Sequence, residues 1–177
     1  MHDMKKKSKI VYLVIYSIFF TLTACGSKEN KKESDETSKE MFKLVPPSHT
    51  QIKFQNNIIE NEKFNMVDFF YVYNGGGVAV GDLNNDNLPD LFYTGNMVDD
   101  ALYINQGNLK FQNISASLEG KSKGWSTGVT MIDINHDGFL DIYVCRSGNY
   151  EEKQRKNLLY INQGDLTFKE QAELYGL

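Results

Sequence analysis

The sequence predicts an all-β fold made of two copies of one unit, and two observations predict it. The first is an internal repeat: Gly-Val-Ala-Val-Gly-Asp at 77–82 aligns with residues 128–133, and Leu-Tyr-Ile-Asn-Gln-Gly at 102–107 recurs at 159–164. The second is composition, since short runs rich in Val, Ile, Tyr and Phe are separated by Gly, Asn and Asp. These are the residue types of strands and turns, not of helices.

Each unit is expected to contain four strands. The first strand ends at the Asp of a polar loop, and the second follows that loop, at 91–93 or 142–144. The third is Leu-Tyr-Ile-Asn, and the fourth carries Phe111 or Phe168. Four short strands at this period fit a blade of a β-propeller. The second unit is longer within residues 146–157, a polar segment that we interpret as a loop insertion.

Both units contain a nine-residue loop with the pattern Asp-x-Asn-x-Asp-[Gly/Asn]-x-x-Asp, at 82–90 and 133–141. Calcium prefers about six to eight oxygen ligands, and side chains at positions 1, 3 and 5 of a tight loop converge on one point. The backbone carbonyl of position 7 and the Asp at position 9 would complete the shell. We therefore predict two Ca²⁺ sites. The ligands of the first are Asp82, Asn84, Asp86, Leu88 and Asp90, and those of the second are Asp133, Asn135, Asp137, Phe139 and Asp141.

Position 6 of such a loop turns sharply with a positive φ, which Gly138 and Asn87 tolerate. His136, at position 4, is expected to face solvent. An EF-hand begins in the same way but needs a Glu at position 12, where this chain has Tyr93 and Val144. The plain alternative is that these are Asp/Asn-rich turns that bind nothing. Two loops at equivalent positions of a repeat favour metal binding.

The N-terminus is typical of an exported lipoprotein. Four lysines at 5–9 precede an apolar run at 10–22, which is too short to span a bilayer, and Leu-Thr-Ala-Cys follows. The last four residues resemble the lipobox of bacterial lipoproteins, which makes Cys25 the expected lipidation site. We predict a signal peptide at 1–25, a polar tether at 26–41 and the repeats at 42–177, anchored at the outer membrane or cell surface. The alternative is an ordinary secretory signal, with Cys25 incidental.

The charge of the exported part argues against some partners. Without residues 1–25 the chain keeps 15 basic and 22 acidic residues, since 19 − 4 = 15 and 23 − 1 = 22, for a net charge of −7. An acidic chain is a poor match for nucleic acid or for an anionic membrane face. We therefore expect no nucleic-acid partner.

The loops, the Gly-Val-Ala-Val-Gly strand and the trailing Leu-Tyr-Ile-Asn-Gln-Gly resemble the FG-GAP/VCBS repeats of integrin α-chain propellers. The wider pattern, with Tyr73-Asn74-Gly75-Gly76-Gly77 and Gly124-Trp125-Ser126-Thr127-Gly128, is similar to exported bacterial proteins of the ASPIC/UnbV type, related to cartilage acidic protein. This resemblance, over roughly residues 42–177, implies a longer propeller followed by an ASPIC/UnbV domain. We therefore expect an incomplete propeller, encoded by an N-terminal fragment.

One segment before the first unit bears on closure of such a propeller. Ile52-Lys53-Phe54-Gln55-Asn56 resembles Leu109-Lys110-Phe111-Gln112-Asn113, the expected fourth strand of the first unit. We predict that residues 52–56 form a strand that pairs at the edge of a blade encoded beyond Leu177, so that within this chain it lacks its proper partner or pairs with one of the two units. On this hypothesis the two units alone are poorly soluble or only partly ordered.

No catalytic motif is evident, and we predict a binding protein, not an enzyme. P-loop and His-Glu-x-x-His patterns are absent from the sequence. The expected partner is an extracellular protein or glycan. The alternative is a calcium-dependent enzyme acting on polysaccharide, with catalytic residues outside this chain; a cleft with Arg or Lys beside Tyr would favour it, and the sequence shows no clear one. Trp125 could present its ring to a glycan, but packing explains it equally well.

Overall fold

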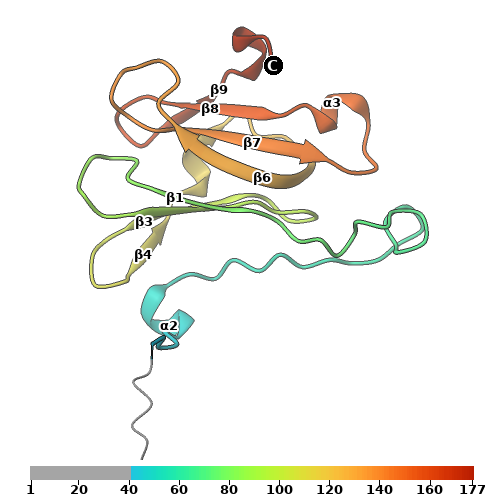
Figure 1. The fold of residues 1–177 in the computed structure, drawn as a ribbon, viewed down its shortest axis with the longest axis horizontal. Coiled ribbons are helices and arrows are strands. Elements are labelled where there is room, and N and C mark those ends of the chain that lie inside the picture. Colours follow the sequence, from blue (N-terminus) through green and yellow to red (C-terminus); the bar gives the residue numbers. More distant parts are fainter. Residues whose placement is uncertain (1–40) are drawn as a thin grey trace, which may run out of the picture. The chain divides into compact units, whose positions relative to one another are not determined.

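The structure is a computed structural model that describes residues 41–177, of which Leu44–Leu177 form one compact unit. The expected signal peptide, Cys25 and nearly all of the expected tether lie outside the described residues. The described part is mostly β structure, in two sheets with a few short helices, as an all-β fold predicts (Figure 1). None of its helices is long and apolar enough to cross a membrane.

The first sheet is an antiparallel meander of four strands, in the order β1-β2-β3-β4. Its strands are β1 (Val78–Gly81), β2 (Asp90–Tyr93), β3 (Ala101–Asn105) and β4 (Phe111–Asn113). Gly81 pairs with Asp90 across the first polar loop, and Asn105 pairs with Phe111 across the next turn. The four strands expected for this unit are therefore confirmed.

The second sheet repeats this meander and adds a strand, in the order β5-β9-β8-β7-β6. Its strands are β5 (Leu118–Glu119), β6 (Trp125–Ile132), β7 (Asp141–Ser147), β8 (Leu158–Asn162) and β9 (Phe168–Glu170). Ile132 pairs with Asp141 and Asn162 with Phe168, which is the register of the first sheet. The parallel pairing of β5 with β9 was not expected from the repeat.

The helices of the described residues are short and lie outside the meanders. They are α2 (Pro47–Thr50), α3 (Glu152–Arg155) and the 3₁₀ helices η1 (Ser115–Ser117) and η2 (Ala172–Tyr175). Helix α3 occupies the segment that makes the second unit longer, between β7 and β8. The insertion therefore lies where the sequence placed it, in a connection between strands.

The main core is formed by residues of both sheets. Because side chains alternate along a strand, every second residue points to this core. Phe92 and Leu102 from the first sheet and Ile142 and Phe168 from the second are fully buried in one cluster. Burying a side chain of this size contributes about 1.5–3 kcal/mol. The two sheets, which Figure 1 shows as stacked layers, are therefore held by apolar packing.

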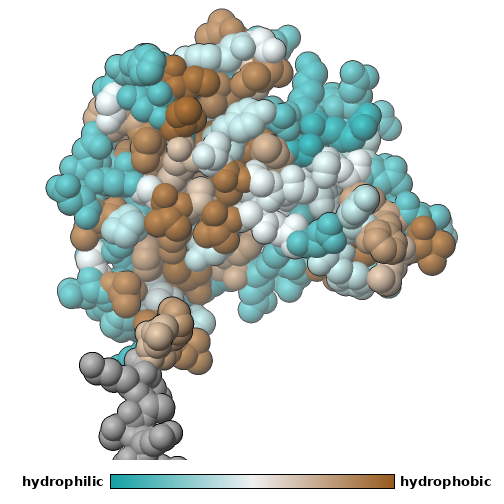
Figure 2. All heavy atoms as spheres, in the orientation of Figure 1, coloured by the Kyte–Doolittle hydropathy of each residue, from teal (hydrophilic) through white to brown (hydrophobic). Residues whose placement is uncertain are grey.

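A second core surrounds Trp125, the first residue of β6, which is 1% exposed. Phe64 stacks on its indole ring with 5.4 Å between ring centroids, and Phe69 meets it edge-on at 5.0 Å. Packing, not presentation to a ligand, therefore accounts for the indole. Both partners belong to the loop before β1, in which Val67 and Phe70 are exposed. Figure 2 shows hydrophobic residues on the projection at its right.

The structure corrects the expectation for residues 52–56, which form no strand. They do alternate between half-buried and exposed positions, as a strand does, and Ile52 and Phe54 pack against the outer face of the first sheet. Phe54 stacks on Tyr93 with 5.1 Å between centroids, and the backbone N–H of Lys53 donates to the Tyr103 hydroxyl at 3.3 Å. The segment crosses a sheet face and is held by side chains, so it has no strand edge to pair with.

We expect Phe54→Ala to lower the free energy of unfolding by about 2 kcal/mol, below the range for a fully buried Phe, because the ring is only partly buried. Chemical denaturation of the full chain measures this. Phe70→Ala, which truncates a ring that is 71% exposed, is the matched control and should change stability little. Equal effects of the two substitutions would contradict the packing role of residues 52–56.

Candidate functional site

The two polar loops, residues 82–90 and 133–141, are organised around the carboxylate at position 1. Asp82 accepts hydrogen bonds from the backbone N–H groups of Asp86 at 3.2 Å and Asn87 at 2.7 Å. In the second loop Asp133 accepts the equivalent bonds from the residues at positions 5 and 6, at 3.1 and 3.0 Å. The two loops therefore fold in the same way.

The backbone of the loops confirms the prediction for position 6. Asn87 has φ = 66° and Gly138 has φ = 90°, both in the left-handed region. Position 4 is left-handed as well, with φ = 60° at Asn85 and 61° at His136, which the pattern did not reveal. Two positive φ angles close together bend the loop tightly, and His136 is exposed, as expected.

The carboxylate at position 9 is buried and joins its loop to the third strand. Asp90 accepts from the backbone N–H of Leu83 at 2.9 Å and of Asn105 at 2.8 Å. Burial raises the pKa of Asp90 above its usual value, and the nearby charges of Asp86 and Asp82 raise it further. These two backbone hydrogen bonds favour the ionised form and oppose that shift.

Asp141 repeats this arrangement in the second unit. It accepts from Ile134 N at 3.0 Å and from Asn162 N at 2.8 Å. Its pKa is also raised, first by burial and then by the charges of Asp137 and Asp133. In each loop three carboxylates therefore influence one another.

The Asn that ends Leu-Tyr-Ile-Asn is a part of the site that sequence reasoning missed. The side-chain amide of Asn105 donates to the carbonyl of Pro89, at position 8 of the first loop, at 2.9 Å. Asn162 donates to Leu140 O at 3.2 Å and to Leu83 O, in the loop of the other unit, at 2.8 Å. The recurrence of this Asn at the end of Leu-Tyr-Ile-Asn in both units was the available signal.

The loops of the two units lie against each other. In addition to the bond from Asn162, the side chain of Asn85 donates to the carbonyl of Gly138 at 3.1 Å. Both loops follow the first strand of their sheet, so they share one end of the structure. A ligand bound by one loop would therefore affect the conformation of the other loop through these hydrogen bonds.

The predicted ligand atoms are of the kind that a hard cation prefers, but in this structure they are not arranged around a common point. All predicted ligand atoms are oxygens of Asp, Asn or backbone, which calcium prefers. Within residues 41–177, however, no group of three or more His, Cys, Asp or Glu side chains is gathered closely enough to hold a metal ion. In both loops the Asn at position 3 donates its amide N–H to the Asp at position 5, from Asn84 to Asp86 at 3.0 Å and from Asn135 to Asp137 at 2.8 Å.

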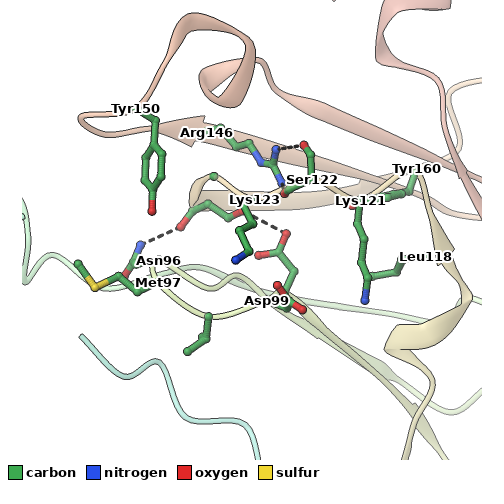
Figure 3. Close-up of a pocket in the computed structure, with 14 residues that line it drawn as sticks. Asn96, Met97, Asp99, Leu118, Lys121, Ser122, Lys123, Arg146, Tyr150 and Tyr160 are labelled. Carbon is green, nitrogen blue, oxygen red and sulfur yellow. Dashed lines mark hydrogen bonds between the residues drawn. The ribbon is translucent and has the colours of Figure 1, made fainter. Parts of the chain in front are cut away.

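A polar cavity of about 310 Å³ lies between the β2–β3 loop and the second sheet. Figure 3 shows side chains from both pointing into it, among them Lys123, Arg146 and Tyr150. The sequence showed no clear cleft of basic residues beside Tyr, and the structure corrects this. Its members come from five separate segments between residues 96 and 160, so no local pattern could have revealed them.

Asp100 is a partly buried acidic group that lines this cavity. Its carboxylate accepts from the backbone N–H of Gly95 at 2.8 Å and from the Ser126 hydroxyl at 3.1 Å. Burial raises the pKa of Asp100, and these two bonds together with the charge of Arg146 offset the shift only in part. The other charged or titratable groups that line the cavity are Asp99, Lys121, Lys123, Tyr150 and Tyr160.

We expect Asp100→Asn to melt at a higher temperature than the wild type at neutral pH. A folded-state pKa above the unfolded value of about 3.9 means that the ionised carboxylate costs stability, and that this cost disappears as the pH falls. The difference in melting temperature between the two proteins should therefore narrow toward pH ~4. The amide oxygen of Asn can still accept from Gly95 N, and its NH₂ can donate to the Ser126 hydroxyl. Thermal melts across this pH range measure the gap, and a gap that does not change with pH would contradict the shift.

The repeat matches a known protein family. A family model described as an FG-GAP-like repeat matches residues 82–144. The match begins at the first Asp of the first loop and contains the whole of the second loop. No curated protein and no solved structure shows significant similarity to the chain. The chain therefore contains an FG-GAP-like repeat over residues 82–144.

Proposed function

We propose that this chain is a calcium-binding β-propeller module, anchored to a bacterial membrane through a lipid on Cys25, that binds an extracellular protein or glycan. The duplicated loop network is the observation that carries the proposal. Two loops with the same ligand spacing, the same positive φ angles and the same hydrogen bonds lie inside the region that matches an FG-GAP-like repeat. Turns that merely reverse the chain need no such duplication of three carboxylates.

Calcium would be held by the side chains at positions 1, 3, 5 and 9 and by the carbonyl of position 7. The carboxylate at position 1 is already fixed by two backbone N–H groups, so part of the shell is preorganised. The side chains of Asn84 and Asp86 are joined by one hydrogen bond, from the Asn84 amide N–H to the Asp86 carboxylate. A bound cation would replace this bond, with both side chains turning an oxygen toward it. Bound calcium would also neutralise three carboxylates that repel one another.

The blade assignment is supported by the equal register of the two meanders. Propeller blades pack face to face, and the outer face of the first sheet keeps apolar side chains in water, since Val78 and Val80 are 54% and 62% exposed. A module of two sheets cannot close a ring, which takes about four to eight blades. On this proposal further blades cover such faces.

Calcium is expected to stabilise the full chain. At a free concentration about tenfold above the dissociation constant, each site contributes about 1.4 kcal/mol, so the melting temperature should rise by several degrees between EGTA and calcium. Differential scanning calorimetry in the two buffers measures this. An unchanged melting temperature would reject calcium binding.

The contribution of one loop can be isolated. Asp137→Asn keeps the acceptor for the Phe139 N–H but removes a charge from the second loop, so it should roughly halve the calcium-induced shift. Asp165→Asn removes an exposed carboxylate outside both loops and is the matched control. Equal calcium responses of these two variants would place the binding elsewhere.

Lipid anchoring is tested by labelling cells with a palmitate analogue. Wild type and Cys145→Ala should incorporate the label and fractionate with membranes, because the acylated residue is Cys25. Cys25→Ala should lose both properties. Equal labelling of all three proteins would reject the lipoprotein assignment and favour an ordinary secretory signal.

The second candidate is a calcium-dependent enzyme acting on polysaccharide. The cavity that places Lys123 and Arg146 beside Tyr150 is the observation that favours it. We rank it second because glycoside hydrolysis takes two carboxylates that flank the scissile bond, and one of the two in this cavity, Asp100, is already hydrogen-bonded to Gly95 N and to the Ser126 hydroxyl. Release of new reducing ends from a polysaccharide incubated with the chain would favour this candidate.

A further inference from the structure

The cavity between the β2–β3 loop and the second sheet contains an unsatisfied donor. Arg146 is 9% exposed, and its Nε is the one buried side-chain nitrogen or oxygen in residues 41–177 without a hydrogen-bond partner. Its two terminal nitrogens are both occupied by Ser122, with Nη1 donating to the hydroxyl at 2.7 Å and Nη2 to the carbonyl. A buried donor without an acceptor is unfavourable, so a ligand that supplies an oxygen there is favoured.

The guanidinium is held in place by its surroundings. A Cβ on Gly124 would lie 3.1 Å from both Cδ and Cζ of Arg146, so the arginine packs directly over that glycine. Together with the two bonds to Ser122, this contact fixes the direction of the Nε–H. The donor is therefore preorganised, which lowers the entropy cost of binding.

Asp100 supplies acceptors in the same cavity. Its carboxylate uses one oxygen for Gly95 N and the other for the Ser126 hydroxyl, and each oxygen keeps a second lone pair. A sugar hydroxyl can accept from Arg146 Nε and donate to such a carboxylate at the same time. A phosphate in that position would meet the negative charge of Asp100 instead, so a hydroxyl suits the wall at Asp100 better.

The exposed groups of the cavity carry a net positive charge. Lys121, Lys123 and Asp99 are exposed, and Figure 3 shows these three side chains apart from Tyr150. Three basic and two acidic groups line the cavity, which leaves a formal charge of 3 − 2 = +1. One carboxylate on the ligand would balance this charge.

We propose that this cavity binds one acidic sugar unit, a hexuronic acid residue of an extracellular glycan. Hydroxyls bridge Arg146 and Asp100, the carboxylate lies against Lys123 and Lys121, and the ring passes Tyr150. The cavity, about 310 Å³, is at the small end of ligand pockets, which suits a single sugar. The inference rests on the binding role proposed above and names the ligand class for it.

The test titrates the full chain, purified in mild detergent, with galacturonate and glucuronate, and with galactose and glucose as neutral counterparts. Isothermal calorimetry and saturation-transfer NMR should show binding of a uronate and at least tenfold weaker binding of the neutral sugar, because only the uronate pairs with the lysines. Absence of uronate binding, or equal binding of both sugars, overturns the inference.

Three variants locate the binding. Lys123→Gln should reduce the affinity for the uronate roughly tenfold and so remove the preference for the uronate over the neutral sugar. Asp100→Asn should reduce the affinity for both sugars. Lys153→Gln removes an equally exposed charge on α3 outside the cavity and should bind as the wild type does. Equal losses in Lys123→Gln and Lys153→Gln would mean non-specific attraction and would overturn the site.

The same titrations in EGTA separate this inference from the calcium proposal. The polar loops join first and second strands, whereas the cavity lies at the β2–β3 connection, so uronate binding in EGTA supports a site independent of bound metal. Calcium stabilisation without uronate binding in either buffer overturns this inference alone. Uronate binding without calcium stabilisation overturns the calcium proposal alone. Uronate binding that requires calcium and is unchanged in Lys123→Gln places the sugar on the metal and overturns this site.

Discussion

A single buried carboxylate per unit holds each meander together. Asp90 starts β2, closes the polar loop through Leu83 N and reaches across to Asn105 N at the end of β3. Asp141 does the same for β7 and β8. Removing such a carboxylate would leave two buried backbone N–H groups unpaired in each unit, which is more costly than losing one exposed bond. Loop shape and strand register therefore depend on the same side chain.

The two sheets are joined by polar contacts as well as by the apolar core. Asn96, in the β2–β3 loop, donates to the carbonyl of Ser126 at 2.9 Å, and Ser126 N donates to Gly95 O at 3.1 Å. These bonds tie the loop of the first sheet to the start of β6 in the second. Asp100 is the last residue of the same loop and Arg146 lies on β7, so the cavity exists only where the two units meet. A single unit could not form it.

Most of the strand architecture was predictable because it is encoded locally and twice. The alternation of apolar residues and the Asp-x-Asn-x-Asp pattern each recur at a fixed spacing, so eight strands and both loops follow from the sequence. Residues 52–56 show the limit of this reasoning, since they have the alternation of a strand but meet a sheet face instead of an edge. Periodicity reports which side of a segment is buried, not what buries it. The contacts of Trp125 and Arg146 could not be predicted either, because their partners are distant in sequence.

The topology assigns the two candidate sites to opposite ends of the sheets. In an antiparallel meander the connection after the first strand and the connection after the second lie at opposite ends, so β2 leads from the polar loop to the cavity. A strand of four residues spans about 13 Å, too far for a calcium ion in the loop to contact a sugar in the cavity. A metal ion in the loop would act on the cavity through β2, whose first residue is Asp90 and whose end is followed by Gly95 and Asn96. On the two proposals above, calcium would therefore be a structural ion, and side chains at the other end of the sheets would bind the ligand.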